Sequence, residues 1–432
     1  MDVPRQSEFS IWCDRVFESE TMRFAPKSIR VAKGRFQSVE PLENFDAPEG
    51  ETILDLRGSA MAPPLVDPHI HVYMNPWPLD PSARAIPGSR ERTEEIQLAR
   101  RRMEDAHLAG LGWGRDLGDP LGVNLAVAED AKSNPALPRI LASGCAVYLE
   151  GRYGRFIGKP VADREGLCQA VMALINDPRV DLVKLIPTGI VNFKKGLVTA
   201  PPQFSTADLR AAVTIAHDHG KKVAAHCSGE PGIRHAVEAG VDFIEHGYFI
   251  ERETMELLAE KQLVWTPTLA PVHAQWNHAK TCGWDDVVKA NIRSILDNHL
   301  ETLSQARQTG VKIMAGSDAG SPGVPHGGGL IRELELMETA GFSPLELLAM
   351  ATTRAVCWIH GETETDRIAP GAPADFIVFR GNLQVQGISV LRHLEWVARD
   401  GIVRPGSPPA MESDDGAENY GLVTNGGEAC GR

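Results

Sequence analysis

The sequence lacks the features that mark membrane, secreted and nucleic-acid-binding proteins. It contains no run of eighteen uncharged apolar residues, as a membrane-spanning helix needs. It also has no early charged segment followed by an apolar core, as a secretory signal needs. Basic residues are in the minority, because 44 Lys and Arg face 57 Asp and Glu and leave a net charge of −13. We therefore expect a cytoplasmic protein with no membrane or nucleic-acid partner.

A disulfide framework is missing as well. The seven cysteines are odd in number and widely spaced, and no two of them form a C-x-x-C pair. This usage is typical of reduced thiols in a cytosolic protein. The sequence also shows no internal repeat or low-complexity tract of the kind that builds a scaffold.

The middle of the chain alternates short apolar runs with amphipathic stretches. Eight runs are candidate strands: LVDPHIH, GWGRDLG, RILASGCAVYL, VDLVKLI, KKVAAHC, VDFIEHG, LVWTPTL and VKIMAGSD. Candidate helices between them include residues 92–109, 163–176, 205–219, 251–261 and 285–309. Strands that alternate with helices predict a parallel sheet, and eight of them suffice to close a (β/α)₈ TIM barrel. The fold class is therefore α/β.

The two ends of the chain have a different pattern. Short strand-like pieces separated by turn residues occur in residues 8–60 and again in 367–404. Neither end has enough apolar residues for its own core, so we expect them to pair in one small β-sandwich domain. The expected domains are residues 1–63 and 359–404 for the sandwich and 64–358 for the barrel. Residues 405–432, rich in Gly, Pro, Ser and acidic residues, are expected to be a flexible tail.

Candidate metal ligands lie at the ends of the predicted strands. His69 and His71 are two residues apart, which places both imidazoles on one face of a strand in a chelating arrangement. His226 and His246 close two successive strands and would supply a second metal with nitrogen ligands. Asp318 follows the eighth strand and offers a carboxylate. Because barrel active sites lie at the carboxyl ends of the strands, we expect these side chains to meet.

Lys184 lies inside the apolar run VDLVKLIP, where an unpaired ammonium group is costly. One interpretation is that its amine reaches solvent at the strand end or pairs with a carboxylate. The alternative, which the other five ligands favour, is that burial depresses its pKa until the neutral amine reacts with carbon dioxide. The carbamate formed in this way is a carboxylate on a long arm that can bridge two cations.

Other residues are candidates for binding the substrate. Arg115 and Arg152 follow predicted strands, and basic residues at this rim of an acidic protein suggest a substrate that carries a carboxylate. A structural ion pair with the adjacent Asp116 is the alternative for Arg115. Tyr248, two residues after His246, is a candidate hydrogen-bond donor to the substrate. His326 lies in a glycine-rich loop after the last strand that is expected to approach the site.

These motifs together resemble the amidohydrolase superfamily. The resemblance rests on VDPHIH, the strand lysine, AAHCSG, EHG, AGSDAG, LLAMATTRAV and DRIAPGAPADFIVF, and it covers about residues 9–404. The most similar branch contains imidazolonepropionase-like proteins and zinc-dependent prolidase or carboxypeptidase-type peptidases. The chain has YLEGRYGRFIGKP where that branch has a Gly-His-rich loop, so the substrate is not carried over.

The resemblance implies a binuclear metal-dependent hydrolase. His69, His71 and Asp318 would hold one divalent cation, His226 and His246 the other, and carboxylated Lys184 would bridge them. Zinc is expected, with manganese, iron or cobalt as alternatives. A metal-bound hydroxide would cleave a carbon–nitrogen bond in an amide, peptide or cyclic amide, with Asp318 as general base and acid.

Three other functions remain open from the sequence. One is a mononuclear deaminase, for which Glu230 is the candidate glutamate after the fifth strand. The second is an ester or lactone hydrolase that uses the same hydroxide. The third is a catalytically silent metal-binding module. We expect the protein to act on a small molecule and to form a homo-oligomer.

Overall fold

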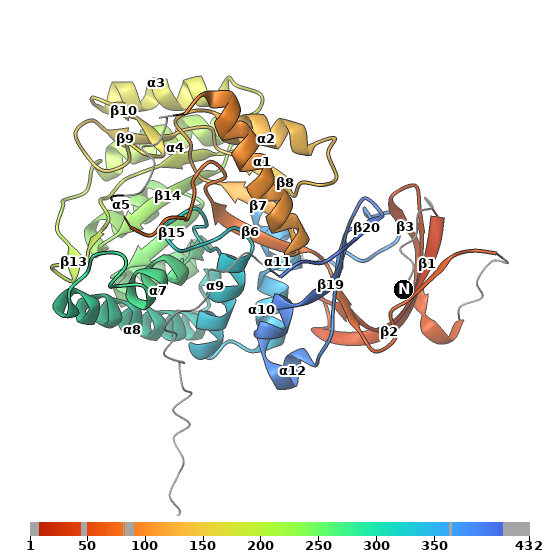
Figure 1. Cartoon of the computed structure of the whole chain (residues 1–432). Coiled ribbons are helices and arrows are strands. Elements are labelled where there is room, and N and C mark those ends of the chain that lie inside the picture. The colour runs from red at the N-terminus through yellow and green to blue at the C-terminus, as the bar shows by residue number, and fades with distance from the viewer. Residues whose placement is uncertain (1–7, 45–49, 81, 83–89, 363–364, 409–432) are drawn as a thin grey trace, which may run out of the picture.

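Parallel strands alternate with helices through the middle of the chain, as the sequence predicts (Figure 1). The structure, a computed structural model, describes residues 8–44, 50–80, 82, 90–362 and 365–408. One sheet consists of β6 (Leu65–Ile70), β7 (Leu111–Asp116) and β8 (Arg139–Ala142). A second sheet runs in the order β10 (Gly158–Val161), β9 (Ala146–Leu149), β11 (Val183–Leu185), β14 (Val223–Ser228), β15 (Phe243–Tyr248), β16 (Val264–Thr266) and β17 (Lys312–Ile313).

The two parallel sheets contact each other at two places. A parallel bridge pairs Ile70, at the end of β6, with Ala319, which follows β17. On the other side the Asp181 amide donates to the Ala142 carbonyl of β8 at 2.9 Å. The carboxyl ends of β6 and of the segment after β17 are therefore neighbours, although 250 residues separate them in sequence.

One predicted strand is divided in two. The run RILASGCAVYL forms β8 and β9, with Ser143–Cys145 between them. Gly144 has a positive φ of 66°, a left-handed conformation that extended strands do not contain. The chain turns at this glycine, so one apolar run supplies a strand to each parallel sheet.

The helices agree with the predicted ranges to within one or two residues. Ser205 caps α4 in a capping box with Asp208, and Gly220, Gly240 and Gly310 follow helices with positive φ. The helices are α1 (Arg92–Leu108), α2 (Val123–Ala131), α3 (Arg164–Ile175), α4 (Thr206–Asp218), α5 (Glu230–Ala239), α6 (Arg252–Glu260), α7 (Leu269–Asn277), α8 (Asp286–Thr309), α9 (Gly328–Thr339), α10 (Pro344–Met350), α11 (Thr353–His360) and α12 (Leu383–Gln386), with 3₁₀ turns η1 (Leu42–Asn44) and η3 (Ile388–Arg392).

Among the described helices, none has the length and apolar character needed to cross a membrane.

The apolar core lies between the parallel strands and the surrounding helices. Buried strand residues such as Val183, Ala225 and Ile244 pack with apolar faces of the helices. Burying each large aliphatic side chain contributes roughly 1.5–3 kcal/mol. At the amino ends of the strands, Val66 and Val264 share a buried cluster with Ala355 of α11. Because this end is filled by α11, the opposite, carboxyl end is the one available for a site.

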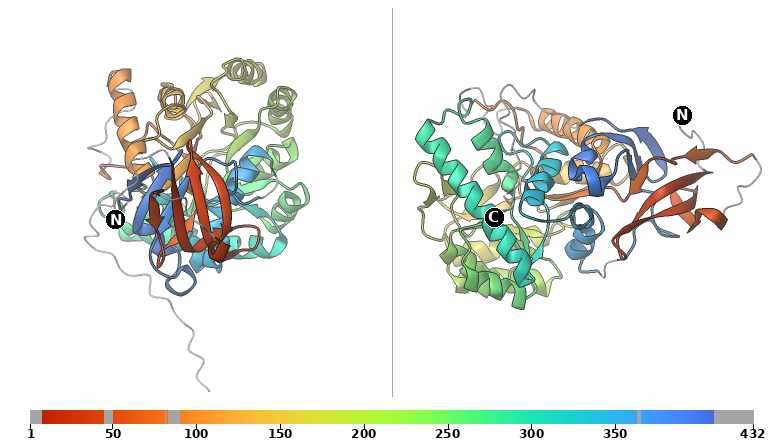
Figure 2. Two further views of the ribbon diagram at one scale, coloured as in Figure 1. Left: turned by 90° about the vertical axis from the view of Figure 1, so that its right-hand side faces the viewer. Right: turned by 90° about the horizontal axis from the view of Figure 1, so that it is seen from below.

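Strands from both ends of the chain form one sheet beside this region (Figures 1 and 2). The strands are β1 (Glu8–Glu18), β2 (Arg23–Ala32), β3 (Arg35–Pro41), β4 (Ile53–Asp55), β5 (Ala60–Ala62), β18 (Phe376–Phe379), β19 (Leu394–Arg399) and β20 (Ile402–Pro405). Phe36 and Phe376 pack in its own apolar cluster. β5 pairs with both β1 and β18 and so joins the two ends.

Part of the expected flexible tail is ordered. Pro405 ends β20, and the Ser407 amide donates to the Leu108 carbonyl at the end of α1 at 2.9 Å. The other residues of the expected tail, 409–432, lie outside the described part of the chain.

Candidate metal centre

The six side chains expected to meet line one cavity of about 490 Å³. His69, Lys184, His226 and His246 belong to β6, β11, β14 and β15, His71 follows β6, and Asp318 follows β17. Parallel strands that lie side by side bring their carboxyl ends together, so residues spread over roughly 250 positions reach the same space. All six lie on the wall of this cavity: His69, His71, Lys184, His226, His246 and Asp318.

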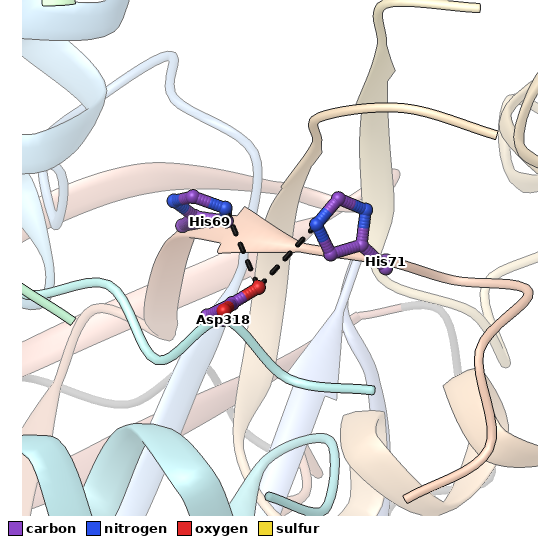
Figure 3. Close-up of side chains that lie close together, drawn as sticks. All are labelled: His69, His71 and Asp318. Carbon is purple, nitrogen blue, oxygen red and sulfur yellow. Dashed lines mark ion pairs between the residues drawn. The ribbon is translucent and has the colours of Figure 1, made fainter. Parts of the chain in front are cut away.

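Three of the side chains form a close group (Figure 3). His69 and His71 both point an Nε2 atom at Asp318 Oδ1, at 3.4 Å and 3.3 Å. One potential ligand atom from each residue lies within 4.8 Å of the others. Two imidazole nitrogens and one carboxylate oxygen at this spacing are a donor set that suits a divalent transition metal.

The outer nitrogens of the two histidines are already engaged. His69 Nδ1 lies 2.8 Å from Glu245 Oε2, and His71 Nδ1 lies 3.0 Å from the Gly118 carbonyl oxygen. Because both partners are acceptors, each Nδ1 carries the proton. In the neutral rings the Nε2 lone pairs then face the cavity, which is the tautomer that a metal ligand requires.

The side chains of the close group shift one another's pKa values. Burial lowers the pKa of His69 to about 4 and keeps this ring neutral. Burial acts in the same direction on His71, but its hydrogen bond to Asp318 outweighs it and raises the pKa of His71. Burial would raise the pKa of Asp318, and His69 and His71 together lower it. A divalent cation held here would take the place of the interaction between His71 Nε2 and Asp318 Oδ1.

The other three ligands adjoin this group. The His226 and His246 ring centroids are 4.4 Å apart, and His246 lies 4.9 Å from His69. His246 Nδ1 is held by the Thr268 hydroxyl at 2.7 Å. Within the described part of the chain, His226 Nε2 and Lys184 Nζ are buried and have no hydrogen-bond partner. Buried polar atoms without a partner are rare, and here they point to a missing ligand.

Burial also controls the charges of His226 and Lys184. It lowers the pKa of His226 to about 3 and that of Lys184 to about 8. His226 is therefore neutral, and Lys184 has a larger fraction of neutral amine at neutral pH than an exposed lysine. Both residues are in the protonation state, or close to it, that ligation or carboxylation needs.

A left-handed backbone aims two of the ligands into the cavity. Alternation along β15 would place Glu245 and His246 on opposite faces, yet Glu245 contacts His69 and His246 also lies beside His69. His246 has φ 70°, and the pairing of β14 with β15 shifts by one residue at this point. Asp318 has φ 55°. Strained backbone of this kind clusters at functional sites. The sequence patterns did not predict the left-handed conformation of these two residues.

Asp67 fixes the position of Asp318 relative to the histidines. Its carboxylate accepts from the Ser317 amide at 3.0 Å, the Ser317 hydroxyl at 2.5 Å and the His69 amide at 3.3 Å. Burial raises the pKa of Asp67 to about 7. These bonds tie β6 to the segment after β17, so Asp67 positions ligands that are distant in sequence.

Arg115 is buried and does not line the cavity. It is 1% exposed, lies outside the cavity wall, and donates to Glu245 Oε1 at 2.6 Å and to the Pro68 carbonyl at 2.6 Å. The structure does contain an ion pair of Arg115, but its partner is Glu245 and not the neighbouring Asp116, which accepts from the Val72 and Gly118 amides. Burial opposes ionisation of Glu245, but Arg115 and His69 outweigh it and lower the pKa of Glu245 to about 2.

Glu245 is therefore a positioning residue that the sequence analysis missed. It precedes His246 in the motif FIEHG, inside a strand whose other residues are buried and mostly apolar. A carboxylate within such a run is a signal that a buried cation or histidine lies nearby.

Replacing Glu245 with glutamine is expected to loosen metal binding and weaken the fold. The neutral amide leaves Arg115 buried without an anion, which costs about 3–5 kcal/mol in the free energy of unfolding. Losing the carboxylate behind His69 is expected to lower metal affinity by about 10–100-fold. Urea unfolding and chelator competition measure the two effects. Glu238→Gln, which alters an exposed ion pair with Arg234, is the control and should change neither.

The remaining candidates for substrate contact occupy three different environments. Arg152 lies outside the cavity wall and donates to the Pro201 carbonyl at 2.5 Å. His326 is buried behind His71 and lies 3.1 Å from the carbonyl oxygen of that residue, so it supports the ligand loop. Tyr248 does line the cavity, but its hydroxyl donates to the Thr268 carbonyl at 3.0 Å. Of these candidates, Tyr248 alone reaches the cavity.

Glu230 does not reach the cavity either. It begins α5, where its carboxylate accepts from the Glu251 amide at 2.8 Å and from the Thr254 hydroxyl. It is absent from the residues that line the cavity. The glutamate expected for a mononuclear deaminase thus has a structural role at the start of a helix.

Gly320 is expected to tolerate no side chain beside the ligands. Its φ is 101°, and an added Cβ would lie 2.8 Å from the His71 carbonyl oxygen. Gly320→Ala should therefore displace His71 or Asp318 and reduce both metal content and activity. Gly240→Ala is the control, since φ there is 88° and nothing lies within 4 Å of the added atom. Both variants carry a left-handed penalty of about 1–2 kcal/mol, but metal content should fall in Gly320→Ala alone.

Comparison with known proteins places the chain among hydrolases of this architecture. It is 28% identical over 368 residues to an uncharacterized protein of Mycobacterium tuberculosis, which covers 85% of this chain and 89% of the relative. It is 29% identical over 185 residues to ochratoxinase of Aspergillus niger, covering 42% of this chain and 37% of that enzyme.

Solved structures show the same fold over nearly the whole chain. A Xaa-Pro dipeptidase with methionine bound in its active site superposes with a TM-score of 0.80 at 25% identity, covering 93% of this chain and all of the dipeptidase. The sequence model of the amidohydrolase family matches residues 60–406, which include all six candidate ligands. The chain therefore belongs to the amidohydrolase family, and it is a hydrolase that acts on carbon–nitrogen bonds.

Proposed function

We propose that this protein is a binuclear metal-dependent amidohydrolase that cleaves the amide bond of a small molecule. The observation that carries the proposal is the set of six side chains, four imidazoles, one amine and one carboxylate, around a single buried cavity. The similarity to a Xaa-Pro dipeptidase and to ochratoxinase supports an amide rather than another carbon–nitrogen bond.

The donor set fits two divalent cations. His69, His71 and Asp318 would hold one, and His226 and His246 the other. Nitrogen and oxygen ligands of this kind suit zinc, with manganese, iron or cobalt as alternatives. The partnerless Nε2 of His226 is the observation that most directly supports a second ion. When bound, such cations polarise a carbonyl oxygen and lower the pKa of water towards neutrality.

Lys184 would connect the two ions as a carbamate. The ammonium group first loses one proton, the neutral amine attacks carbon dioxide, and a nitrogen–carbon bond forms with loss of a second proton, so the side chain changes from a cation to an anion. The pKa of about 8, caused by burial, supports this reaction because the neutral amine is accessible near neutral pH. An anion on Lys184 would also offset the positive charge that the cations bring into a buried site.

Asp318 would move the proton during hydrolysis. Its Oδ1 atom contacts the Nε2 atoms of His69 and His71, and its Oδ2 atom accepts a hydrogen bond from the Ser321 hydroxyl at 3.0 Å. Water adds to the substrate carbonyl carbon, Asp318 takes the proton that water releases, and it returns that proton to the departing amine nitrogen. Cleavage then yields one carboxylate and one amine. Proton transfer of this kind accelerates a reaction by about 10²–10⁴-fold.

We also propose that the protein consists of a barrel domain and a β-sandwich domain. The contacts of β6 with the segment after β17, and of β8 with the residue Asp181 before β11, support closure into a (β/α)₈ barrel, with residues 64–358 as the barrel domain. The sheet shared by both ends supports a β-sandwich domain built from residues 1–63 and 359–404.

The alternatives differ in what they require of this site. A mononuclear deaminase requires a glutamate in the cavity, and the helical position of Glu230 disfavours it. An ester or lactone hydrolase would use the same residues, so a substrate panel separates it from an amidase. A silent metal-binding module would be expected to have lost a ligand, whereas all six residue types are present.

Metal analysis of the purified protein tests the proposal. We expect close to two equivalents of transition metal, loss of activity on chelation and recovery on adding zinc or manganese. Less than one equivalent, combined with amide hydrolysis that a chelator does not affect, would contradict it.

A further inference from the structure

Most of the cavity wall above the ligands is apolar, although Ser228, Gln275 and Ser321 also line it. The apolar walls are built from loops and the start of α7, which follow five different strands, so the apolar character does not come from one segment alone. Residues that represent these segments are Met74, Phe156, Ile190, Phe193, Val272 and Pro322. A volume of about 490 Å³ is within the range of pockets that enclose a drug-sized ligand.

No guanidinium or free ammonium group was found for a substrate carboxylate. Among the described residues on the cavity wall, Lys184 is the only lysine or arginine, and it lies with the metal ligands. The arginines considered as carboxylate partners are engaged elsewhere, Arg115 with Glu245 and Arg152 with the Pro201 carbonyl. A carboxylate in the apolar part of this cavity would lose its hydration without gaining a partner.

Apolar side chains also lie at the mouth of the cavity, in a hairpin that carries the exposed Lys194 and Lys195 beyond the cavity wall. Ile190, just before the hairpin of β12 (Val191–Asn192) and β13 (Leu197–Val198), lines the cavity and is still 52% exposed. Phe193 in the same hairpin packs edge-on against Trp284 at 6.0 Å between ring centroids. This contact anchors the hairpin to the start of α8 and holds an apolar surface at the entrance.

We infer that the substrate is a neutral amide that bears at least one bulky aromatic or branched aliphatic group and no free carboxylate. This inference rests on the proposed function and names its substrate class. The apolar group would occupy the space lined by Phe156, Phe193 and Val272, with the scissile carbonyl directed at the ligands below. Water adds across the carbon–nitrogen bond, so the carboxylate of the product appears only at the metal ligands.

A matched set of compounds tests this substrate class. N-benzoyl-phenylalanine methylamide is neutral and bulky, N-benzoyl-phenylalanine differs by its free carboxylate, and N-benzoyl-glycine methylamide lacks the second apolar group. Release of benzoate, followed by mass spectrometry, reports the same scissile bond in all three. We expect kcat/KM for the neutral, bulky compound to be roughly tenfold or more higher than for either of the other two compounds. The free acid would bury an unpaired carboxylate, and the glycine compound would leave part of the apolar pocket unfilled.

Binding provides a readout that does not depend on turnover. Titration calorimetry with the Asp318→Asn variant should give tighter binding of the neutral, bulky methylamide than of the free acid. The substitution Ile190→Lys adds a cation at the mouth and should shift the ratio of affinities towards the free acid by about tenfold. Val385→Lys, at a position 78% exposed on α12 and outside the cavity, is the control and should leave the ratio unchanged.

The outcomes separate this inference from the proposed function. Equal or better hydrolysis and binding of the free acid by the unmodified protein would overturn the substrate class and leave amide hydrolysis intact. Absence of benzoate release and of any other amide cleavage by the metal-loaded enzyme would instead contradict the proposed function.

Discussion

Replacing Lys184 with alanine is expected to lower kcat by about 10³-fold or more. This loss is larger than the roughly 10–100-fold expected when a residue that only hydrogen-bonds to a metal ligand is removed. The side chain is fully buried, its Nζ lacks a hydrogen-bond partner within the described structure, and burial lowers its pKa to about 8. In the proposed centre the variant loses the group that joins the two ions. The measurement is kcat for amide hydrolysis together with metal content per chain.

Chemical rescue gives this prediction a second, independent readout. Formate, acetate or propionate supplied to Lys184→Ala should restore part of the activity, because a small carboxylate can occupy the space of the carbamate. Lys132→Ala is the matched control, since Lys132 is exposed and pairs with Glu129 at the surface. Normal turnover and metal content in Lys184→Ala would show that the bridge does not exist.

Replacing Asp318 with asparagine is expected to reduce kcat by about 10²–10⁴-fold. Asparagine has nearly the same shape and still presents an oxygen to His69 and His71, but it cannot take up a proton at neutral pH. The loss should therefore fall mainly on kcat, with a smaller change in KM. Steady-state kinetics on the neutral benzoyl amide measures both constants.

The companion measurement for Asp318→Asn is its metal content. Retention of at least one equivalent would assign the kinetic loss to proton transfer, whereas an apoprotein would assign it to ligation. Asp286→Asn, an exposed acidic residue in the first turn of α8, is the control. An Asp318→Asn variant with unchanged kcat would remove Asp318 from the proton pathway.

The sequence predicted the convergence of the six side chains because the relevant pattern is local. Apolar runs that end in His, Lys or Asp can be recognised one strand at a time, and parallel strands then bring their carboxyl ends together without further information. His69, Lys184 and Asp318 were identified in this way and line one cavity. The pairing of the two chain ends also followed from each having too little apolar surface for its own core.

The parts that sequence patterns could not predict depend on contacts between distant segments. Arg115 follows a strand as a substrate-binding arginine would, but its partner Glu245 lies 130 residues away and holds it inside the protein. The left-handed backbone of His246, which turns the ring to the same side as Glu245, has no signature beyond the glycine that follows. Gly144 divides one apolar run into two strands, because a single positive φ interrupts an otherwise continuous pattern.

Anomalous diffraction from crystals of the metal-loaded protein tests the central claim most directly. The account predicts two peaks about 3.5–4 Å apart, one beside His69, His71 and Asp318 and the other beside His226 and His246, with extra density on Lys184 between them. A single peak, or peaks distant from these side chains, would contradict it.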